Sequence, residues 1–479
     1  MSDTRNAIDR FFAISARGST ISREVRGGIA TFFTMAYIVV LNPLILANGK
    51  DVTGEYIADS ATAPVALVAA GTAFVAGVLT ILMGVIGRVP FAMAAGLGLN
   101  AFVTFQIATI MTWEEAMGLV FLEGIIIAVL VLTGLRTAIF HAIPAQLKTA
   151  ISVGIGLFIA LIGFVDSGFV RKAAGTPLEL GIGGALTSWP MLVFIIGLLA
   201  TAAMVARKLK GAILIGIVGT TVLAIVVEAI VKAGSFSADN PDGWQLNLPA
   251  MPDQIFGFHN PLVLFAEFDP FGGFVRVDVL LAALLVFTLL ITDFFDTMGT
   301  IVGVGRQANL VQEGGTLPRT REILLVDSLG AAAGGAGSVS SNTTYIESAA
   351  GVGEGARTGL ASVVTGLLFL VAIFFAPLVT IVPYEAAAPA LVLVGFLMMT
   401  AIRDVDWDDF DIAIPAFLTI VIMPFTYSIS NGIGAGFISY VLIKVVRGKA
   451  RSVHPLLWGV ALLFVLYFAI GPIRAMLGL

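Results

Sequence analysis

The chain has 479 residues, of which 58% are hydrophobic and 12% are charged, and its net charge is −5. Since soluble proteins carry about 25% charged residues, this composition excludes an ordinary soluble protein. We expect no nucleic-acid partner. The chain has no cysteine and only three, widely separated histidines, which excludes disulfides and thiolate metal sites and predicts neither a metal nor a cofactor.

The apolar residues are grouped in runs of about 20, the length that a helix needs to cross about 30 Å of hydrocarbon. We therefore predict an all-α polytopic membrane protein with fourteen transmembrane spans. The predicted spans lie at 27–46, 64–87, 90–112, 115–134, 145–165, 189–206, 211–231, 277–304, 322–338, 340–352, 358–382, 386–402, 411–428 and 431–446.

Residues 1–26 form a polar tail with five arginines, which we place in the cytoplasm as an uncleaved segment. If the following loops alternate between the two sides, 20 of the 26 lysines and arginines lie on the cytoplasmic side. This bias supports the topology. We expect the protein to lie in the plasma (cell inner) membrane. The C-terminal apolar element, 447–479, contains a stretch at 455–473 that is either a fifteenth span or a helix lying in the membrane interface.

A long polar segment, 232–276, separates two groups of seven spans, and it falls on the extracellular side. Because seven is an odd number, the second group has the inverted orientation of the first. Inverted repeats that share a site near the middle of the membrane are typical of secondary transporters. The sequence therefore predicts a 7+7 inverted repeat with a transport function.

The third span of each half has an unusual composition. In the first half it reads PFAMAAGLGLNAFVTF (90–105), and in the second half it reads GGAGSVSSNTTYIESAAG (334–351). Glycine, serine and threonine at this density do not favour a continuous helix. We predict that spans 3 and 10 are broken, each with a short extended stretch followed by a half-helix. The N-termini of the two half-helices would converge near the bilayer centre, at the transport site.

Five carboxylates fall inside predicted spans: Glu123, Asp293, Asp296, Asp327 and Glu347. An ionised side chain at the centre of a membrane helix costs about 2.5–3.5 kcal/mol, so such residues usually face the protein interior and serve a function. Asp293 and Asp296 are followed by Thr297 and Thr300, and this i, i+3, i+4, i+7 spacing predicts one polar face. An alternative is that the two aspartates only hold the backbone of a broken neighbour.

Glu347 follows directly after the broken stretch of the tenth span. Two interpretations remain open: it binds a ligand, or it is an ordinary glutamate at the start of a helix. Asn100 occupies the corresponding place in the third span, and its amide can donate and accept hydrogen bonds or tie the backbone together. For Glu123 we expect a structural or proton-related role. Asp327 lies closer to a span end, where we expect it to pair with a cytoplasmic arginine.

Four segments carry a resemblance to a known family: ATFFTMAYIVVLNPLIL (30–46), AMAAGLGLNAF (92–102), TDFFDTMGTIVGV (292–304) and SSNTTYIESAAGVGEGARTGLASVVTGLLF (340–369). They resemble the AzgA-like purine permeases, a branch of the nucleobase–cation symporter-2 and nucleobase–ascorbate transporter superfamily. The resemblance implies a core domain, a gate domain and a homodimer. The implied core domain is 27–134 and 277–382, and the implied gate domain is 145–231 and 386–446.

The resemblance also implies that acids on spans 8 and 10, here Asp293 and Glu347, bind the base. Because burial and a nearby second acid favour protonation of one of them, we expect these two acids to couple transport of the base to a proton. The expected substrate-binding set is Asp293, Glu347, Asn100, Asp296, Gly98, Thr344 and Tyr345. We further expect Phe33 or Phe294 to cover one face of the base. The predicted function is the import of guanine, hypoxanthine or adenine through the lipid bilayer by proton symport.

Several alternatives remain at this point. Sodium is a second possible coupling ion, because Asp, Asn and Thr oxygens also coordinate it. An anion carrier on the same fold is disfavoured, since two acids in one pocket would repel its substrate. An intramembrane aspartyl protease is disfavoured, because it needs its two acids on different helices beside a water-filled cleft, whereas Asp293 and Asp296 share one predicted helix. A purine sensor that binds the base without transporting it is a further alternative. We therefore expect a transporter that is not an enzyme.

Overall fold

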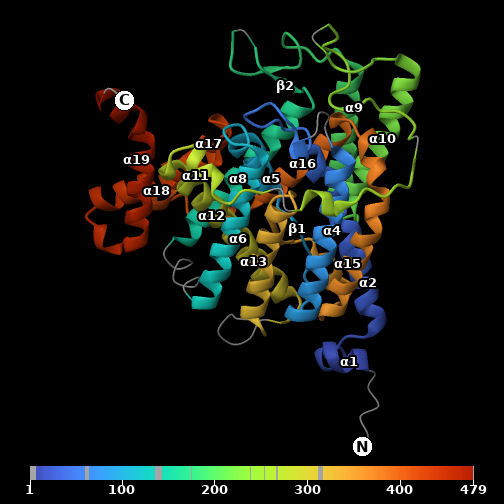
Figure 1. The fold of residues 1–479 in the computed structure, drawn as a ribbon, viewed down its shortest axis with the longest axis horizontal. Helices are drawn as coiled ribbons and strands as arrows, with labels where there is room; N and C mark the ends of the chain where they lie inside the picture. Colours follow the sequence, from blue (N-terminus) through green and yellow to red (C-terminus); the bar gives the residue numbers. More distant parts are fainter. Residues whose placement is uncertain are drawn as a thin grey trace, which may run out of the picture.

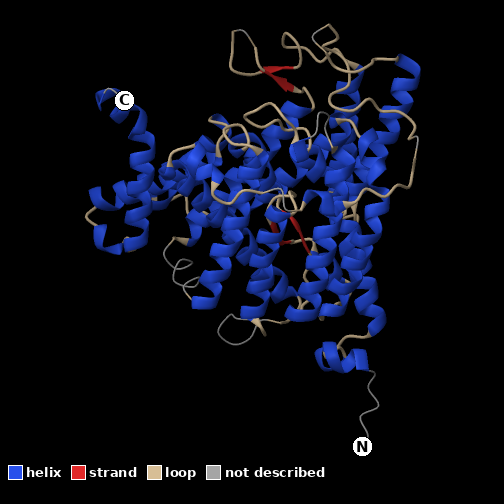
Figure 2. Ribbon diagram, viewed as in Figure 1, coloured by secondary structure: helices blue, strands red, loops and turns tan. Residues whose placement is uncertain are grey.

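The structure is a computed structural model that describes residues 7–59, 64–134, 143–173, 175–237, 239–252, 254–265, 268–310 and 317–477. Its main body is a bundle of helices with two short two-stranded sheets (Figures 1 and 2). The helices are α1 Ala7–Phe12, α2 Ile21–Met35, α3 Ile38–Leu46, α4 Val65–Leu82, α5 Leu97–Phe102, α6 Trp113–Thr133, α8 Ala145–Asp166, α9 Trp189–Ala206, α10 Ala212–Val231, α11 Gly272–Arg276, α12 Val279–Gln307, α13 Thr320–Ala336, α14 Ser348–Gly353, α15 Gly359–Ala372, α16 Tyr384–Met399, α17 Phe410–Phe425, α18 Ile429–Val446 and α19 Pro455–Leu477. The strands are β1 Met93–Ala95, β2 Val170–Arg171, β3 Glu179–Leu180 and β4 Asn342–Thr344.

The helices have the length and composition of membrane spans. Within the described residues, nine helical segments are long and apolar enough to cross a bilayer, among them Trp113–Thr133 and Ala212–Val231. Shorter apolar helices accompany them, including Val279–Phe294 and Phe410–Phe425. The prediction of a helical, multi-pass membrane protein is confirmed.

The first long helix begins earlier than predicted. Helix α2 starts at Ile21, because Thr20 caps it by accepting a hydrogen bond from the backbone N–H of Arg23. Glu24 is fully buried and accepts hydrogen bonds from the backbone N–H groups of Arg357, at 2.8 Å, and Thr358, at 3.2 Å. The end of the polar tail is therefore helical and tied to the loop before α15.

Strands β1 and β4 lie side by side inside the helical body, between its two ends, and we call this paired segment the β1–β4 crossing (Figure 2). They pair in antiparallel register, with Met93 opposite Thr344 and Ala95 opposite Asn342. Short helices follow almost at once, α5 after β1 and α14 after β4. Chain that is not helical needs such partners at membrane depth, because no water is present to satisfy its backbone groups.

Helices distant in the sequence pack in two sets. Helix α6 packs on α13 and α4 packs on α15, whereas α8 packs on α16 and α17. Glycine permits the closest approaches. A Cβ atom on Gly124 of α6 would lie 2.2 Å from the backbone nitrogen of Ala332, and one on Gly156 of α8 would lie 2.7 Å from the carbonyl oxygen of Gly395. Close backbone contact of this kind is typical of helix association in membranes.

The end of the bundle opposite the N-terminus carries a β2–β3 hairpin that the sequence did not indicate, and the long connection between α10 and α11 begins there (Figure 1). Within the connection, Trp244 is fully buried and donates through Nε1 to Glu228 at 2.7 Å, which anchors it to α10. The predicted apolar stretch 455–473 forms α19, which packs against α18 and α12.

Candidate functional site

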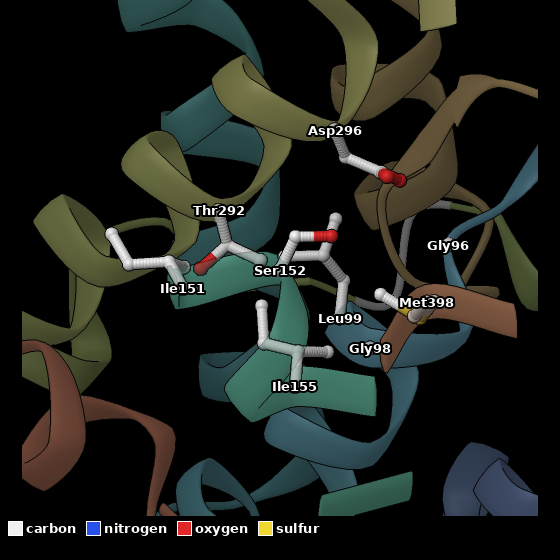
Figure 3. Close-up of a pocket in the computed structure, with 9 residues that line it drawn as sticks. All are labelled: Gly96, Gly98, Leu99, Ile151, Ser152, Ile155, Thr292, Asp296 and Met398. Carbon is white, nitrogen blue, oxygen red and sulfur yellow. The ribbon is translucent and has the colours of Figure 1, made fainter. Parts of the chain in front are cut away.

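A pocket lies beside the β1–β4 crossing, within the described part of the chain. The space there that protein atoms do not occupy is about 360 Å³, which includes open solvent. Figure 3 shows that its walls come from four separate parts of the fold. The lining residues are Gly96, Gly98, Leu99, Ile151, Ser152, Ile155, Thr292, Asp296 and Met398.

The segment after β1 and helix α8 come unusually close at the pocket. Gly98 lies in the first turn of α5, and a Cβ atom there would lie 2.6 Å from Cγ2 of Ile155 on α8. Glycine is therefore required for this approach in the present conformation. The opposite sides of the pocket carry different chemistry, with Asp296 from α12 on one side and Met398 from α16 on the other.

Asp296 is the acidic residue of the pocket. It is exposed even though it lies within the bundle, and it lines the pocket, so its open surface faces this space. It interacts electrostatically with Glu347, which directly precedes α14. Two acids from different parts of the chain thus come together beside the strand crossing.

Two tyrosines hold the region around Glu347. Tyr37, between α2 and α3, donates through its hydroxyl to Oε1 of Glu347 at 2.5 Å. Tyr345 donates to the carbonyl oxygen of Ala95, at the end of β1. Both tyrosines also interact electrostatically with Asp296. This arrangement fixes one carboxylate oxygen of Glu347 and locks the two strands together.

Asp293 points to a different place from Asp296. Its side chain is fully buried, it does not line the pocket, and it faces the buried carboxyl group of Glu123 on α6. The predicted single polar face of α12 is therefore divided. Three residues turn a helix by about 300°, so positions 293 and 296 differ by about 60° in direction. Thr292, one turn before Asp296, shares the pocket side instead.

Asp327 also lies inside the protein, not at a span end beside an arginine as expected. It is fully buried, and its Oδ1 accepts hydrogen bonds from Thr297 Oγ1 at 3.1 Å, from the Thr344 backbone N–H at 3.2 Å and from Thr344 Oγ1 at 3.0 Å. Glu123 interacts with Asp327 as well as with Asp293. Three buried acids therefore form an inner cluster, defined here as Glu123, Asp293 and Asp327.

Other predicted residues lie near the pocket without lining it. Asn100 is fully buried with both side-chain amide atoms lacking hydrogen-bond partners, and the hydroxyl of Thr344 is engaged by Asp327. The expected aromatic cover is not formed by Phe33, which is 53% exposed, or by Phe294, which is fully buried. Apolar contact comes instead from Leu99, shown with the other lining residues in Figure 3.

Sequence reasoning did not identify several of the residues at the site. Ser152 is an isolated hydroxyl in the apolar segment AISVGIGLF, and this was the signal available for it. Thr292 could have been found as the residue one turn before Asp296. Met398 and Tyr37 gave no signal, because only the packing of distant helices brings them to this place.

A family model described as "Permease family" matches residues 22–435. The chain belongs to this permease family. The guanine/hypoxanthine permease PbuG of Bacillus subtilis (strain 168) is 37% identical over 466 residues, which cover 96% of this chain and 98% of the relative. The adenine permease AdeP of Escherichia coli (strain K12) is 36% identical over 462 residues, which cover 96% and 95% of the two chains.

Among solved structures, the transmembrane domain of a cyanobacterium bicarbonate transporter, BicA, is similar in fold. The TM-score is 0.56 at 14% identity, and the match covers 88% of this permease and 97% of that chain. The family resemblance seen in the sequence motifs is confirmed, and the protein is a multi-pass membrane permease rather than an enzyme.

Proposed function

We propose that this permease is a secondary active transporter that imports purine nucleobases, namely guanine, hypoxanthine or adenine, by proton symport. Relatives that match almost the full chain are guanine/hypoxanthine and adenine permeases. The observation that carries the proposal is the convergence of Asp296 and Glu347, from separate parts of the fold, beside a pocket next to non-helical chain.

The pocket has the chemistry that a purine base requires. A base is flat and neutral, with N–H donors and oxygen or nitrogen acceptors at its edge. A carboxylate can accept two adjacent N–H groups, and such charge-assisted bonds are about twice as strong as neutral ones. Asp296 is placed to accept from the base, Glu347 completes the polar edge, and Leu99, Ile155 and Met398 contact the ring faces.

We therefore propose that Asp296 is the main substrate-binding residue of α12. Glu347, Gly98 and Tyr345 remain parts of the proposed site. Gly98 lines the pocket and Tyr345 fixes the strand crossing. Asn100 is retained because its buried amide has no hydrogen-bond partner among the described residues, and because it follows the lining residue Leu99 in α5. Thr344 acts indirectly, through its hydrogen bonds to Asp327.

We assign proton coupling to Asp293 and Glu347. Asp293 faces the carboxyl group of Glu123, and a proton between them removes the repulsion of two buried charges. Glu347 shares a short hydrogen bond with Tyr37 and is electrostatically coupled to Asp296. If protonation favours base binding, binding favours protonation to the same extent, because linkage is reciprocal. This relation produces symport.

The architecture that goes with this function has fourteen spans in a 7+7 inverted repeat, with broken third and tenth spans. The separate packing sets support it, because α6 and α13 belong to the core ranges and α8 and α16 to the gate ranges. The pocket lies between the two, with Asp296 on the core side and Ser152 on the gate side. We place the N-terminus in the cytoplasm and propose a homodimer in the plasma membrane.

Transport by the purified protein in proteoliposomes tests this proposal. We expect labelled hypoxanthine, guanine or adenine to accumulate when the lumen is made alkaline in sodium-free buffer. Accumulation that requires a sodium gradient would mean that the coupling ion is sodium and not a proton. Absence of purine uptake under both gradients, together with bicarbonate or sulfate uptake, would favour an anion carrier, the function suggested by the fold similarity alone.

A further inference from the structure

The side chains that line the pocket offer more hydrogen-bond acceptors than hydrogen-bond donors. An ionised carboxylate only accepts hydrogen bonds, and the glycine, leucine, isoleucine and methionine side chains offer no polar hydrogen. Among the lining side chains, Ser152 and Thr292 are therefore the two hydroxyl donors. A purine with an exocyclic oxygen needs a donor at that oxygen, since an unpaired polar group in a closed site costs about 1–3 kcal/mol.

The two hydroxyls differ in their access to the pocket. The Thr292 oxygen is enclosed, and its side chain is 5% exposed. Ser152 is half-buried and comes from α8, across the pocket from Asp296. Figure 3 shows its hydroxyl oxygen directed away from its own helix and into the space between the walls. Ser152 is thus the accessible donor.

Ser152 differs in its hydrogen bonding from two other helical hydroxyls, those of Ser439 and Thr149. Serine and threonine in helices commonly donate to the carbonyl four residues earlier. Ser439 donates to Ala435 at 2.6 Å, and Thr149, one turn before Ser152 on α8, donates to Ala145 at 3.2 Å. Among the described residues, Ser152 makes no bond of this kind to a backbone carbonyl, so its donor is available to the pocket that it lines.

We propose that Ser152 donates a hydrogen bond to the exocyclic oxygen at position 6 of the bound base. This inference rests on the proposed purine transport and adds a specificity-determining residue to it. In 6-oxopurines, that oxygen is adjacent to the N1–H group that Asp296 accepts. The carboxylate on α12 and the hydroxyl on α8 then hold neighbouring atoms of one edge. The bound base bridges the two walls of the pocket.

Paired ligands that differ only at this atom test the inference. Hypoxanthine and 6-mercaptopurine both carry N1–H, but sulfur is a much weaker acceptor than oxygen. Inhibition constants for both are measured by competition with labelled hypoxanthine in the wild-type protein and in Ser152→Ala. Loss of one neutral hydrogen bond corresponds to about a 2- to 12-fold weaker affinity. We expect this loss for hypoxanthine and a change below about 2-fold for 6-mercaptopurine.

Thr149→Val is the matched control, because it removes a hydroxyl from the same helix that is bonded to its own backbone. Ser152→Thr keeps the donor and should retain the preference for hypoxanthine. Equal losses for both ligands in Ser152→Ala, or no loss for either, would overturn the inference. Failure of the wild-type protein to bind any purine would instead overturn the proposed function, so the two failures are distinguishable.

Discussion

The acids of α12 and its neighbours form two groups with contrasting environments. In the pocket group, Asp296 is exposed and lies beside Glu347, whose carboxylate is held by Tyr37. In the inner cluster, Asp293 and its neighbours are fully buried among one another and among threonine hydroxyls. Asp293 and Asp296 are only one helical turn apart, yet one is accessible to a ligand and the other is enclosed.

Under the proposed symport, this contrast corresponds to two separate tasks. A group that binds substrate must be accessible and must change its contacts when the base enters or leaves. A group that holds a proton can remain buried, provided that its charge is balanced when the proton leaves. We therefore expect base binding to depend on Asp296 and the proposed proton coupling to depend on Asp293 in the inner cluster, and each expectation predicts a distinct defect.

The largest expected effect is the loss of base binding in Asp296→Ala. Each charge-assisted hydrogen bond to the base contributes about 1.5–3 kcal/mol, which corresponds to about a 10- to 150-fold loss of affinity per bond. Equilibrium binding of labelled hypoxanthine to the purified protein measures this loss. The control is Asp411→Ala at the start of α17, where a buried carboxylate pairs with Lys444 instead of facing the pocket. Unchanged hypoxanthine affinity in Asp296→Ala would abolish the distinction between the two acid groups.

Asp293→Asn should produce the complementary defect. We expect hypoxanthine binding within about 2-fold of the wild-type value, because the side chain does not line the pocket and keeps its shape. Accumulation driven by a pH gradient should be lost, since the amide cannot release a proton. The defect is measured by comparing counterflow, which needs no pH gradient, with uptake that a pH gradient drives. A variant that still concentrates hypoxanthine against its gradient would show that the proton is held elsewhere.

The same contrast shows how far the sequence could be interpreted. Helix limits follow from apolar run length, so 145–165 and 189–206 agree closely with Ala145–Asp166 and Trp189–Ala206. Spacing along α12 identified both aspartates but could not choose between them, because that choice depends on which neighbour faces each side. The partner Glu123 is distant in the sequence, and its contact with Asp293 exists only in the folded bundle.

The pocket wall formed by α8 and α16 was missed for a related physical reason. Ile151, Ile155 and Met398 belong to ordinary apolar helices, and their role depends on the packing of α8 on α16. A hydrophobic side chain that lines a pocket has the same local pattern as one that fills a core. Only Ser152, as a polar residue in such a helix, carried a signal before the structure was known.

A smaller effect is expected where the two walls approach each other. In Gly98→Ala the new methyl group would lie 2.6 Å from Ile155 Cγ2, so α8 must shift or the pocket must narrow. Overpacking costs about 1–3 kcal/mol, and we expect about a 5- to 150-fold loss of hypoxanthine affinity. Adding Ile155→Ala should recover most of it by removing the clash. If the double variant binds no better than Gly98→Ala, the narrowing is not the cause.

The smallest expected effect concerns the support of Glu347. Tyr37→Phe removes the hydroxyl that donates to the Glu347 carboxylate at 2.5 Å but keeps the ring. Because Tyr37 acts by positioning another residue, we expect only about a 2- to 12-fold loss of hypoxanthine affinity. Tyr440→Phe on α18, which also removes a hydroxyl from a buried tyrosine, is the control and should leave the affinity unchanged.

A double-mutant cycle decides whether Tyr37 acts through Glu347. In a Glu347→Gln background the tyrosine no longer bonds to a carboxylate, so the further loss caused by Tyr37→Phe should be smaller than in the wild type. Equal losses in both backgrounds would mean that the phenol supports the pocket independently of this acid. The pocket group would then consist of Asp296 alone, and the contrast with the inner cluster would rest on a single exposed carboxylate.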